Sequence, residues 1–135
     1  MATTVTRVNP PTMPDASTAG YSQISIAEPG RLAFVSGQVA WSVNGQPAPK
    51  TLLEQTKIVI GNLKAALTAV GATPHDLVAL KIYVVDLTPE RMEASMPLVV
   101  DFLEGARPSL TGIGVAGLAG PDLQVEIEMI VRVPS

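Results

Sequence analysis

The sequence contains no cysteine and only one histidine, His75, among its 135 residues. The absence of cysteine excludes disulfide bonds, cysteine-ligated zinc sites and thiol nucleophiles. A single histidine also argues against a histidine-rich metal site and against a Ser-His-Asp triad built within one chain. We therefore expect no metal centre and no other cofactor in this protein.

Basic residues are few and scattered, because nine Lys and Arg face twelve Asp and Glu and the net charge is −3. Nucleic-acid binding depends on clustered basic side chains, so no nucleic-acid partner is expected. No stretch approaches the roughly 18 to 20 apolar residues that a membrane span requires. Residues 1–15 lack the basic segment and apolar run of a secretory signal. These absences predict a cytoplasmic protein that does not contact a membrane.

Apolar residues, by contrast, are abundant: 47% of the chain is hydrophobic and only 16% is charged. The length suits a single domain spanning residues 1–135. A domain of this size has a high ratio of surface to volume and normally carries more polar residues. We therefore expect identical subunits to cover part of the apolar surface in a homo-oligomer.

The order of local signals predicts an α+β fold. Prolines make residues 1–20 an irregular lead-in, with a possible first strand at Thr3–Val8. The turn signal Glu28-Pro29-Gly30 predicts a hairpin that joins 24–26 to 31–36. Further on, the patterns predict helices at 51–71 and 88–105 and strands at 77–87, 109–118 and 123–133. We expect one mixed β-sheet with both helices on one face.

Capping signals define the two helices. Thr51 and Glu54 have the spacing of a capping box, and Gly71 suits the left-handed position after the first helix. Thr88-Pro89 is typical of a cap followed by the first helical residue. Residues at helical spacing predict the buried face of the first helix: Leu53, Ile60, Leu63, Leu67 and Val70. Met92 and Met96 are interpreted as core residues of the second helix.

Short motifs occur in a fixed order from Tyr21 onward: Gly20-Tyr21-Ser22-Gln23, Phe34-Val35-Ser36-Gly37-Gln38, Asn62-Leu63-Lys64-Ala65, Tyr83-Val84-Val85-Asp86-Leu87, Arg107-Pro108, Val115-Ala116 and Val125-Glu126-Ile127-Glu128. The ordered set resembles the RidA family, also called YjgF/YER057c/UK114. The resemblance implies the chorismate-mutase-like fold and a homotrimer with a central β-barrel-like core.

The same resemblance implies a small-molecule pocket between adjacent subunits. Active members hydrolyse reactive enamines and imines, and an arginine in a Pro-Ala-Arg-Ser type motif binds the substrate carboxylate. By position, Glu126 and Tyr21 match the residues that place water and protons, and Gly37 matches the glycine before the pocket. Leu110 stands where the family has its arginine, which leaves no donor for a carboxylate. Backbone amides near Gly37 and Gly112 would hold the ligand.

Several alternatives stay open at the level of sequence. Glu126 and Glu128 share one face of a strand and could line the pocket or lie on an exposed sheet edge. Arg107, which precedes a proline and is expected to be extended, could form a surface salt bridge or reach the pocket mouth. Leu110 could be a packing residue or mark a pocket for a less anionic or more apolar ligand. The chain could therefore be a deaminase-like hydrolase with an altered substrate, or a trimer that binds or senses a metabolite. Ribonucleolytic activity suits this acidic chain poorly.

Overall fold

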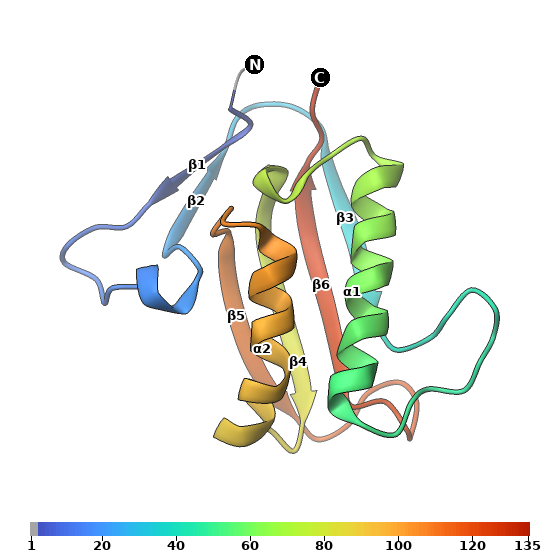
Figure 1. The fold of residues 1–135 in the computed structure, drawn as a ribbon. Helices are drawn as coiled ribbons and strands as arrows, with labels where there is room; N and C mark the ends of the chain where they lie inside the picture. Colours follow the sequence, from blue (N-terminus) through green and yellow to red (C-terminus); the bar gives the residue numbers. More distant parts are fainter. Residues whose placement is uncertain (1–2) are drawn as a thin grey trace.

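Two helices lie side by side on one face of a mixed β-sheet, as expected (Figure 1). The computed structural model describes residues 3–135, so the first two residues of the predicted lead-in 1–20 lie outside it. Within 3–135, neither helix is long and apolar enough to cross a bilayer. In chain order the elements are β1 (Val5–Val8), the 3-10 turn η1 (Ser17–Ala19), β2 (Ile24–Ala27), β3 (Leu32–Gln38), α1 (Leu52–Ala69), the 3-10 turn η2 (Pro74–Asp76), β4 (Leu77–Val85), α2 (Pro89–Leu103), β5 (Ser109–Val115) and β6 (Val125–Arg132).

The strands form two hydrogen-bonded sheets rather than the one sheet that was predicted. The larger sheet has the order β3-β6-β4-β5, in which only β4 and β5 run parallel. The strands β1 and β2 pair with each other in a separate two-stranded sheet. A single parallel bridge joins Ser22, just before β2, to Ser109 on the edge strand β5, and the hydroxyl of Ser109 donates a hydrogen bond to that of Ser25 on β2.

The predicted hairpin joining 24–26 to 31–36 is wrong. β2 pairs with β1, whereas β3 pairs with the C-terminal strand β6. The guanidinium of Arg132 lies against Gly30 and donates hydrogen bonds to the carbonyl oxygens of Glu28, at 2.7 Å, and Pro29. The segment 28–30 therefore wraps around this arginine and carries the chain from the small sheet to the large one.

Both ends of α1 form through local interactions. The hydroxyl of Thr51 accepts a hydrogen bond from the amide of Glu54 at 3.1 Å. At the other end Gly71 has a φ of +68°, and the amide of Ala72 donates to the carbonyl of Leu67 at 2.9 Å. This geometry is a Schellman motif, which satisfies carbonyls at the end of the helix.

The buried face of α1 is turned slightly from the predicted one. Leu53 is 43% exposed, whereas its neighbour Leu52 is buried. Successive helical residues are about 100° apart, so a shift of one residue moves a side chain off the core face. The predicted residues Ile60, Leu63 and Leu67 are buried as expected.

The main core lies between the helices and the large sheet. Its fully buried side chains come from α1, α2, β4 and β6, and they include Leu63, Leu80, Ile82, Leu103, Ile127 and Met129. Two buried hydroxyls, those of Thr56 and Ser95, lie 2.9 Å apart and join α1 to α2. This core leaves the opposite face of the sheet without helical cover (Figure 1).

That open face is partly apolar and partly acidic. Phe34 and Leu32 on β3 are 71% and 46% exposed. Along β6, Val125, Ile127 and Met129 are buried while Glu126 and Glu128 are only half-buried. This period of two confirms that both glutamates share one face of the strand, the face that points away from the helices.

Candidate functional site

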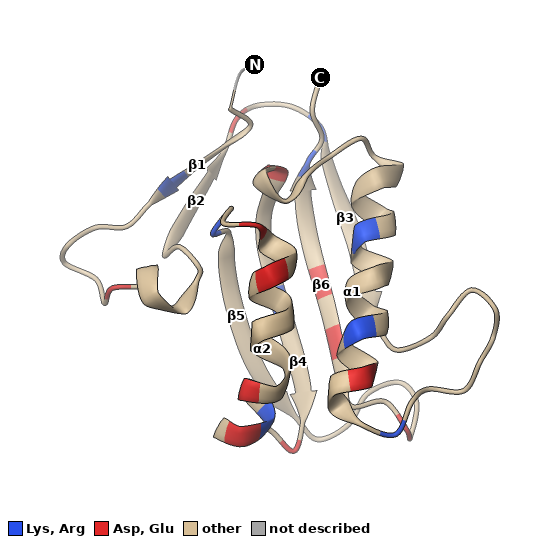
Figure 2. Ribbon diagram, viewed as in Figure 1, with Lys and Arg blue, Asp and Glu red and all other residues tan. Residues whose placement is uncertain are grey.

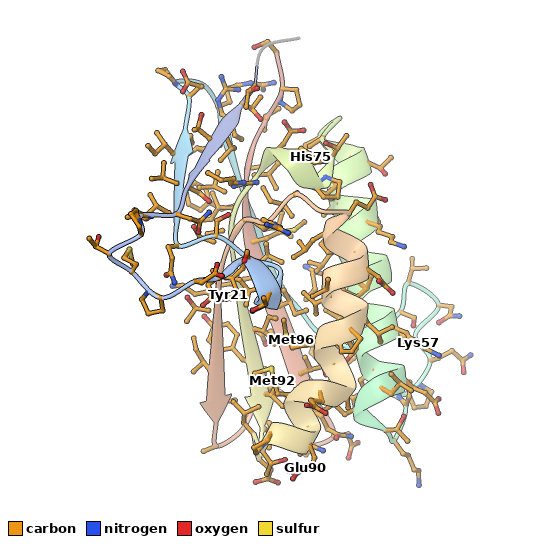
Figure 3. All side chains as sticks on the ribbon, turned by 60° about the vertical axis from the view of Figure 1, so that its left-hand side comes forward. Tyr21, Lys57, His75, Glu90, Met92 and Met96 are labelled. Atoms are coloured by element: carbon orange, nitrogen blue, oxygen red, sulfur yellow. The ribbon has the colours of Figure 1, made fainter. Side chains whose placement is uncertain are left out.

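A broad groove of about 810 Å³ runs between α2, β5 and the segment that precedes β2. Figure 3 shows Met92 and Met96 on α2 and Tyr21 on the N-terminal segment around this region. The groove is lined by Ala19, Tyr21, Met92, Glu93, Met96, Pro97, Val100, Asp101, Leu110 and Gly112. Three predicted site residues, Tyr21, Leu110 and Gly112, therefore lie together.

The parallel pairing of β4 and β5 explains how Leu110 and Gly112 reach the groove. Leu110 pairs with Leu80 and Gly112 pairs with Ile82. Residues paired in a parallel ladder point to the same face, and Leu80 and Ile82 belong to the core under the helices. A Cβ at Gly112 would lie 3.0 Å from Cε of Met92. The glycine therefore lets the methionine side chain approach the sheet closely.

Gly37 and Glu126 form a second cluster on the open face. A Cβ atom at Gly37 would come within 2.6 Å of Cδ and 2.8 Å of Cγ of Glu126. Contacts this short do not occur in proteins, so only a glycine leaves room for the glutamate in its present position. The absence of a side chain at Gly37 thus leaves the space that the carboxylate of Glu126 occupies.

Tyr83 joins this cluster, although the sequence interpretation did not assign it to the site. Its backbone pairs with Glu126, and its hydroxyl donates a hydrogen bond to the carboxylate of Glu128. This hydrogen bond is the main reason why the pKa of Tyr83 is raised; partial burial and the charges of Glu128 and Glu126 add to the effect. The alternation of strand residues could have placed Tyr83 on a face, but only the β4–β6 register brings it beside the glutamates.

The two clusters lie on opposite faces of one sheet. Tyr21, Leu110 and Gly112 are on the helix side, whereas Gly37 and Glu126 are on the open side. Leu80 of β4 pairs with both Leu110 and Met129, and the side chain of Met129 is opposite to that of Glu126 along β6. Within a single chain, the structure therefore does not bring Glu126 together with Tyr21 and Leu110.

Arg107 does not have the extended conformation expected before a proline, because its φ is +52°. The side chain is exposed, and among the described residues it does not belong to the groove lining. Asp15 lies near it. The pKa of Asp15 is lowered mainly by a hydrogen bond from the amide of Ser17, and the positive charge of Arg107 contributes less. Arg107 thus acts on the charge of Asp15 in the N-terminal segment and is not part of the groove lining.

The charges around the groove are acidic. Figure 2 shows acidic positions along α2 and a basic position in its first turn. That basic residue, Arg91, donates to the carbonyl of Val85 and to Oε1 of Gln124. Only Glu93 and Asp101 contribute charged groups to the lining, and across residues 3–135 no Lys, Arg or His takes part in it. Among residues 3–135, no three side chains of the metal-binding types (His, Cys, Asp or Glu) are grouped so that they could hold a metal ion.

The sequence interpretation of Met92 and Met96 as core residues was right in part, because Met96 packs against the core, but it missed that both side chains also line the groove. Met92 and Met96 are half-buried and line the groove, while Val99, Phe102 and Leu103 fill the core. Residues 92, 96 and 100 are spaced by four, which forms a second apolar row beside the core-facing one. That spacing is the signal in the sequence that could have identified this row.

Comparison with known proteins connects this arrangement to one family. The family model described as Endoribonuclease L-PSP matches residues 12–133. The chain is 36% identical to the RutC family protein YjgH of Escherichia coli over 107 residues, which cover 78% of each chain. A crystal structure from Yersinia pestis, of a protein of unknown function in the Rid family, superposes with a TM-score of 0.89. It is 39% identical and covers 96% of this chain and 98% of its own.

A structure from Mycobacterium tuberculosis, of a member of the YjgF/YER057c/UK114 family, has a TM-score of 0.65 and 28% identity. It covers 96% of this chain and 99% of its own. These matches extend over most of the sequence and include both clusters of candidate residues. The chain therefore belongs to the RidA/YjgF/L-PSP family.

Proposed function

We propose that the chain forms a homotrimer whose ligand clefts lie between adjacent subunits. The groove with Tyr21 and Leu110 in one subunit would face Gly37 and Glu126 of the next. The observation that carries this proposal is the separation of the two clusters by the sheet, because a complete site then requires two copies. The exposed Phe34 and Leu32 support it, since an apolar open face of this kind is typical of a subunit interface.

The chemistry proposed for this cleft is hydrolysis of an imine or enamine. The carboxylate of Glu126 would accept a proton from water while the water oxygen attacks the imine carbon. That proton passes to nitrogen and gives a tetrahedral adduct that carries a hydroxyl and an amino group on one carbon. The carboxylate then takes the hydroxyl proton and delivers it to nitrogen as the carbon–nitrogen bond breaks, so that a carbonyl compound and ammonia or an amine are released. The hydroxyl of Tyr21 would donate a hydrogen bond to the substrate. Backbone amides near Gly37 and Gly112 would help to hold it.

Leu110 sets the limit on the substrate. A charge-assisted hydrogen bond from an arginine to a carboxylate contributes about 1.5–3 kcal/mol, and leucine has no donor to replace it. Small imines that carry a carboxylate should therefore be bound poorly. We propose that the chain has an altered substrate, one recognised through its apolar part rather than through an anionic group.

The alternative is a trimer that binds or senses a metabolite without turnover. The presence of Leu110 where the family has its arginine favours this alternative, because the groove then supplies apolar contacts and no positive charge to stabilise a reacting group. A ribonuclease activity, as the name of the family model suggests, receives no support from this groove. The phosphates of RNA would meet Glu93 and Asp101 with no basic side chain among the described lining residues.

The assembly and the activity can be tested separately. Sedimentation equilibrium should give the mass of three 14.1 kDa chains. Hydrolysis should be followed with two freshly generated substrates: 2-aminoacrylate, through ammonia, and a benzaldehyde imine, through the ultraviolet absorbance of benzaldehyde. We expect a rate above the buffer rate for the benzaldehyde imine and little or none for 2-aminoacrylate.

Glu126→Gln should abolish the enzymatic rate, whereas Glu54→Gln, which removes the same charge at the exposed start of α1, should retain it. A rate that survives Glu126→Gln would contradict the assigned role of the carboxylate. If the protein bound the benzaldehyde imine but did not hydrolyse it faster than buffer does, the alternative function would be established. A monomeric mass would exclude the intersubunit cleft altogether.

A further inference from the structure

The groove beside α2 combines an apolar floor with an acidic rim. Met92, Met96 and Leu110 supply the apolar floor, and Glu93 and Asp101 are exposed residues of the same lining. Lys57 and Lys64 share a neighbouring pocket with Asp101, but among residues 3–135 no basic side chain lines the groove itself. The guanidinium of Arg91 is hydrogen-bonded to Val85 and Gln124, and Arg107 lies outside the lining.

Pro97 adds another acceptor at the rim. It lies within α2 and lines the groove. Proline has no amide hydrogen, so it cannot donate the helical hydrogen bond to the carbonyl four residues earlier, which belongs to Glu93. Both residues are exposed and line the groove, so the Glu93 carboxylate lies there beside a backbone carbonyl that lacks its helical donor. An anion would be repelled here, whereas an ammonium or iminium group could be bound.

We infer that the groove selects small apolar cations, namely primary amines and the protonated imines that form from them. The hydrocarbon part would lie on Met92, Met96 and Leu110, with the nitrogen toward Glu93 and Asp101. This inference deepens the proposed function and rests on it for the location of the groove in the cleft. Such a groove would attract a cation and exclude an anion, whereas an arginine at position 110 would bind a carboxylate.

The test compares three probes of nearly the same shape: benzylamine, benzyl alcohol and benzoate. Their affinities for the intact protein are measured by titration, with amide chemical shifts recorded at each point. Benzylamine should bind best and benzoate worst, and the shifts should map to residues 92–101 and 110–112. Glu93→Gln and Asp101→Asn should each weaken benzylamine binding about two- to fivefold, as expected for exposed charge pairs, and should leave benzyl alcohol binding unchanged.

Glu90→Gln is the matched control, because it removes a charge from the same helix outside the groove lining (Figure 3). It should leave all three affinities unchanged. Leu110→Arg should reverse the order and improve benzoate binding about tenfold. Leu110→Met keeps the site apolar and should preserve the preference for the amine, which separates the effect of charge from any loss of packing.

The inference is overturned if benzoate binds the unmodified protein as tightly as benzylamine, or if benzylamine perturbs amides away from the groove. Equal losses in the Glu90 and Asp101 variants would also overturn it, because the effect would then reflect net charge alone. Benzylamine binding should persist in Glu126→Gln. Failure of imine hydrolysis with intact amine binding would therefore count against the proposed reaction and not against the groove.

Discussion

Replacing Gly37 by alanine tests the position of Glu126 without changing any charge. The new Cβ would come within 2.6 Å of Cδ and 2.8 Å of Cγ of Glu126, well inside the normal contact distance. The backbone at Gly37 does not have the positive φ found at other glycines of this chain, so alanine can adopt its conformation. The clash must then be relieved by movement of the Glu126 side chain.

The cost to stability should be small. Moving a half-buried glutamate off its preferred rotamer costs about 0.5–1.5 kcal/mol. Against this, alanine reduces the conformational entropy of the unfolded chain and contributes about 0.4–1 kcal/mol. The free energy of unfolding should therefore change by no more than about 1 kcal/mol. The effect on turnover should be much larger, since displacing a catalytic group by about 1 Å can reduce a rate by a factor on the order of 100.

The assay is urea unfolding at fixed protein concentration together with the imine hydrolysis rate of Gly37→Ala. Gly61→Ala is the control: Gly61 lies within α1, and an added Cβ would meet nothing within 4 Å. That variant should be stabilised by about 0.5–1 kcal/mol with an unchanged rate. If Gly37→Ala kept the full rate, or lost about 3 kcal/mol or more of stability, the reasoning from the contact between Gly37 and Glu126 would be refuted.

Three further predictions concern the fold. The buried side chain of Gln55 makes three hydrogen bonds, one with the backbone amide of Gln124 and two with loop carbonyls. Gln55→Leu removes all three and should lower the free energy of unfolding, measured in urea, by about 2–4 kcal/mol. The raised pKa of Tyr83 means that the folded chain holds the phenol proton more tightly than the unfolded chain, so the resulting stabilisation should be present below about pH 10 and lost as the pH rises through the folded pKa. Glu128→Gln should lower that pKa toward its usual value in an ultraviolet titration of the phenol. Gly71→Ala should cost about 1–2 kcal/mol by thermal or urea unfolding, because φ is +68° there and no side-chain clash contributes.

Local signals predicted the helices well because their causes are local. The caps at Thr51 and Thr88 depend on residues three positions away, and both accept the expected amide hydrogen bonds. The hairpin prediction failed for the opposite reason. The segment 28–30 contains a good turn signal, but its path is set by Arg132, a residue about a hundred positions further along the chain. No local pattern could reveal that contact.

In the candidate site, too, the features that follow from local patterns were predicted and those that follow from strand pairing were not. Strand alternation correctly placed Glu126 and Glu128 on one face. It could not show that Leu110 lies on the other face of the sheet, because that follows from the parallel register of β5 against β4. The contact between Tyr83 and Glu128 was overlooked because it, too, depends on how two strands pair. Arg107 was expected to be extended from its local sequence, but the chain path into β5 gives it a positive φ instead.

The surroundings of Leu110 favour the proposed change of ligand over a decayed site. If the arginine position had simply been lost, the rest of the groove should still suit an anion, with donors or basic side chains near the former carboxylate. Instead the lining supplies thioether and aliphatic surface from Met92 and Met96, and its charged groups, Glu93 and Asp101, are acidic. Leucine at 110 and acids on the rim are therefore mutually consistent, which is why we attribute the groove to a different ligand rather than to the absence of one.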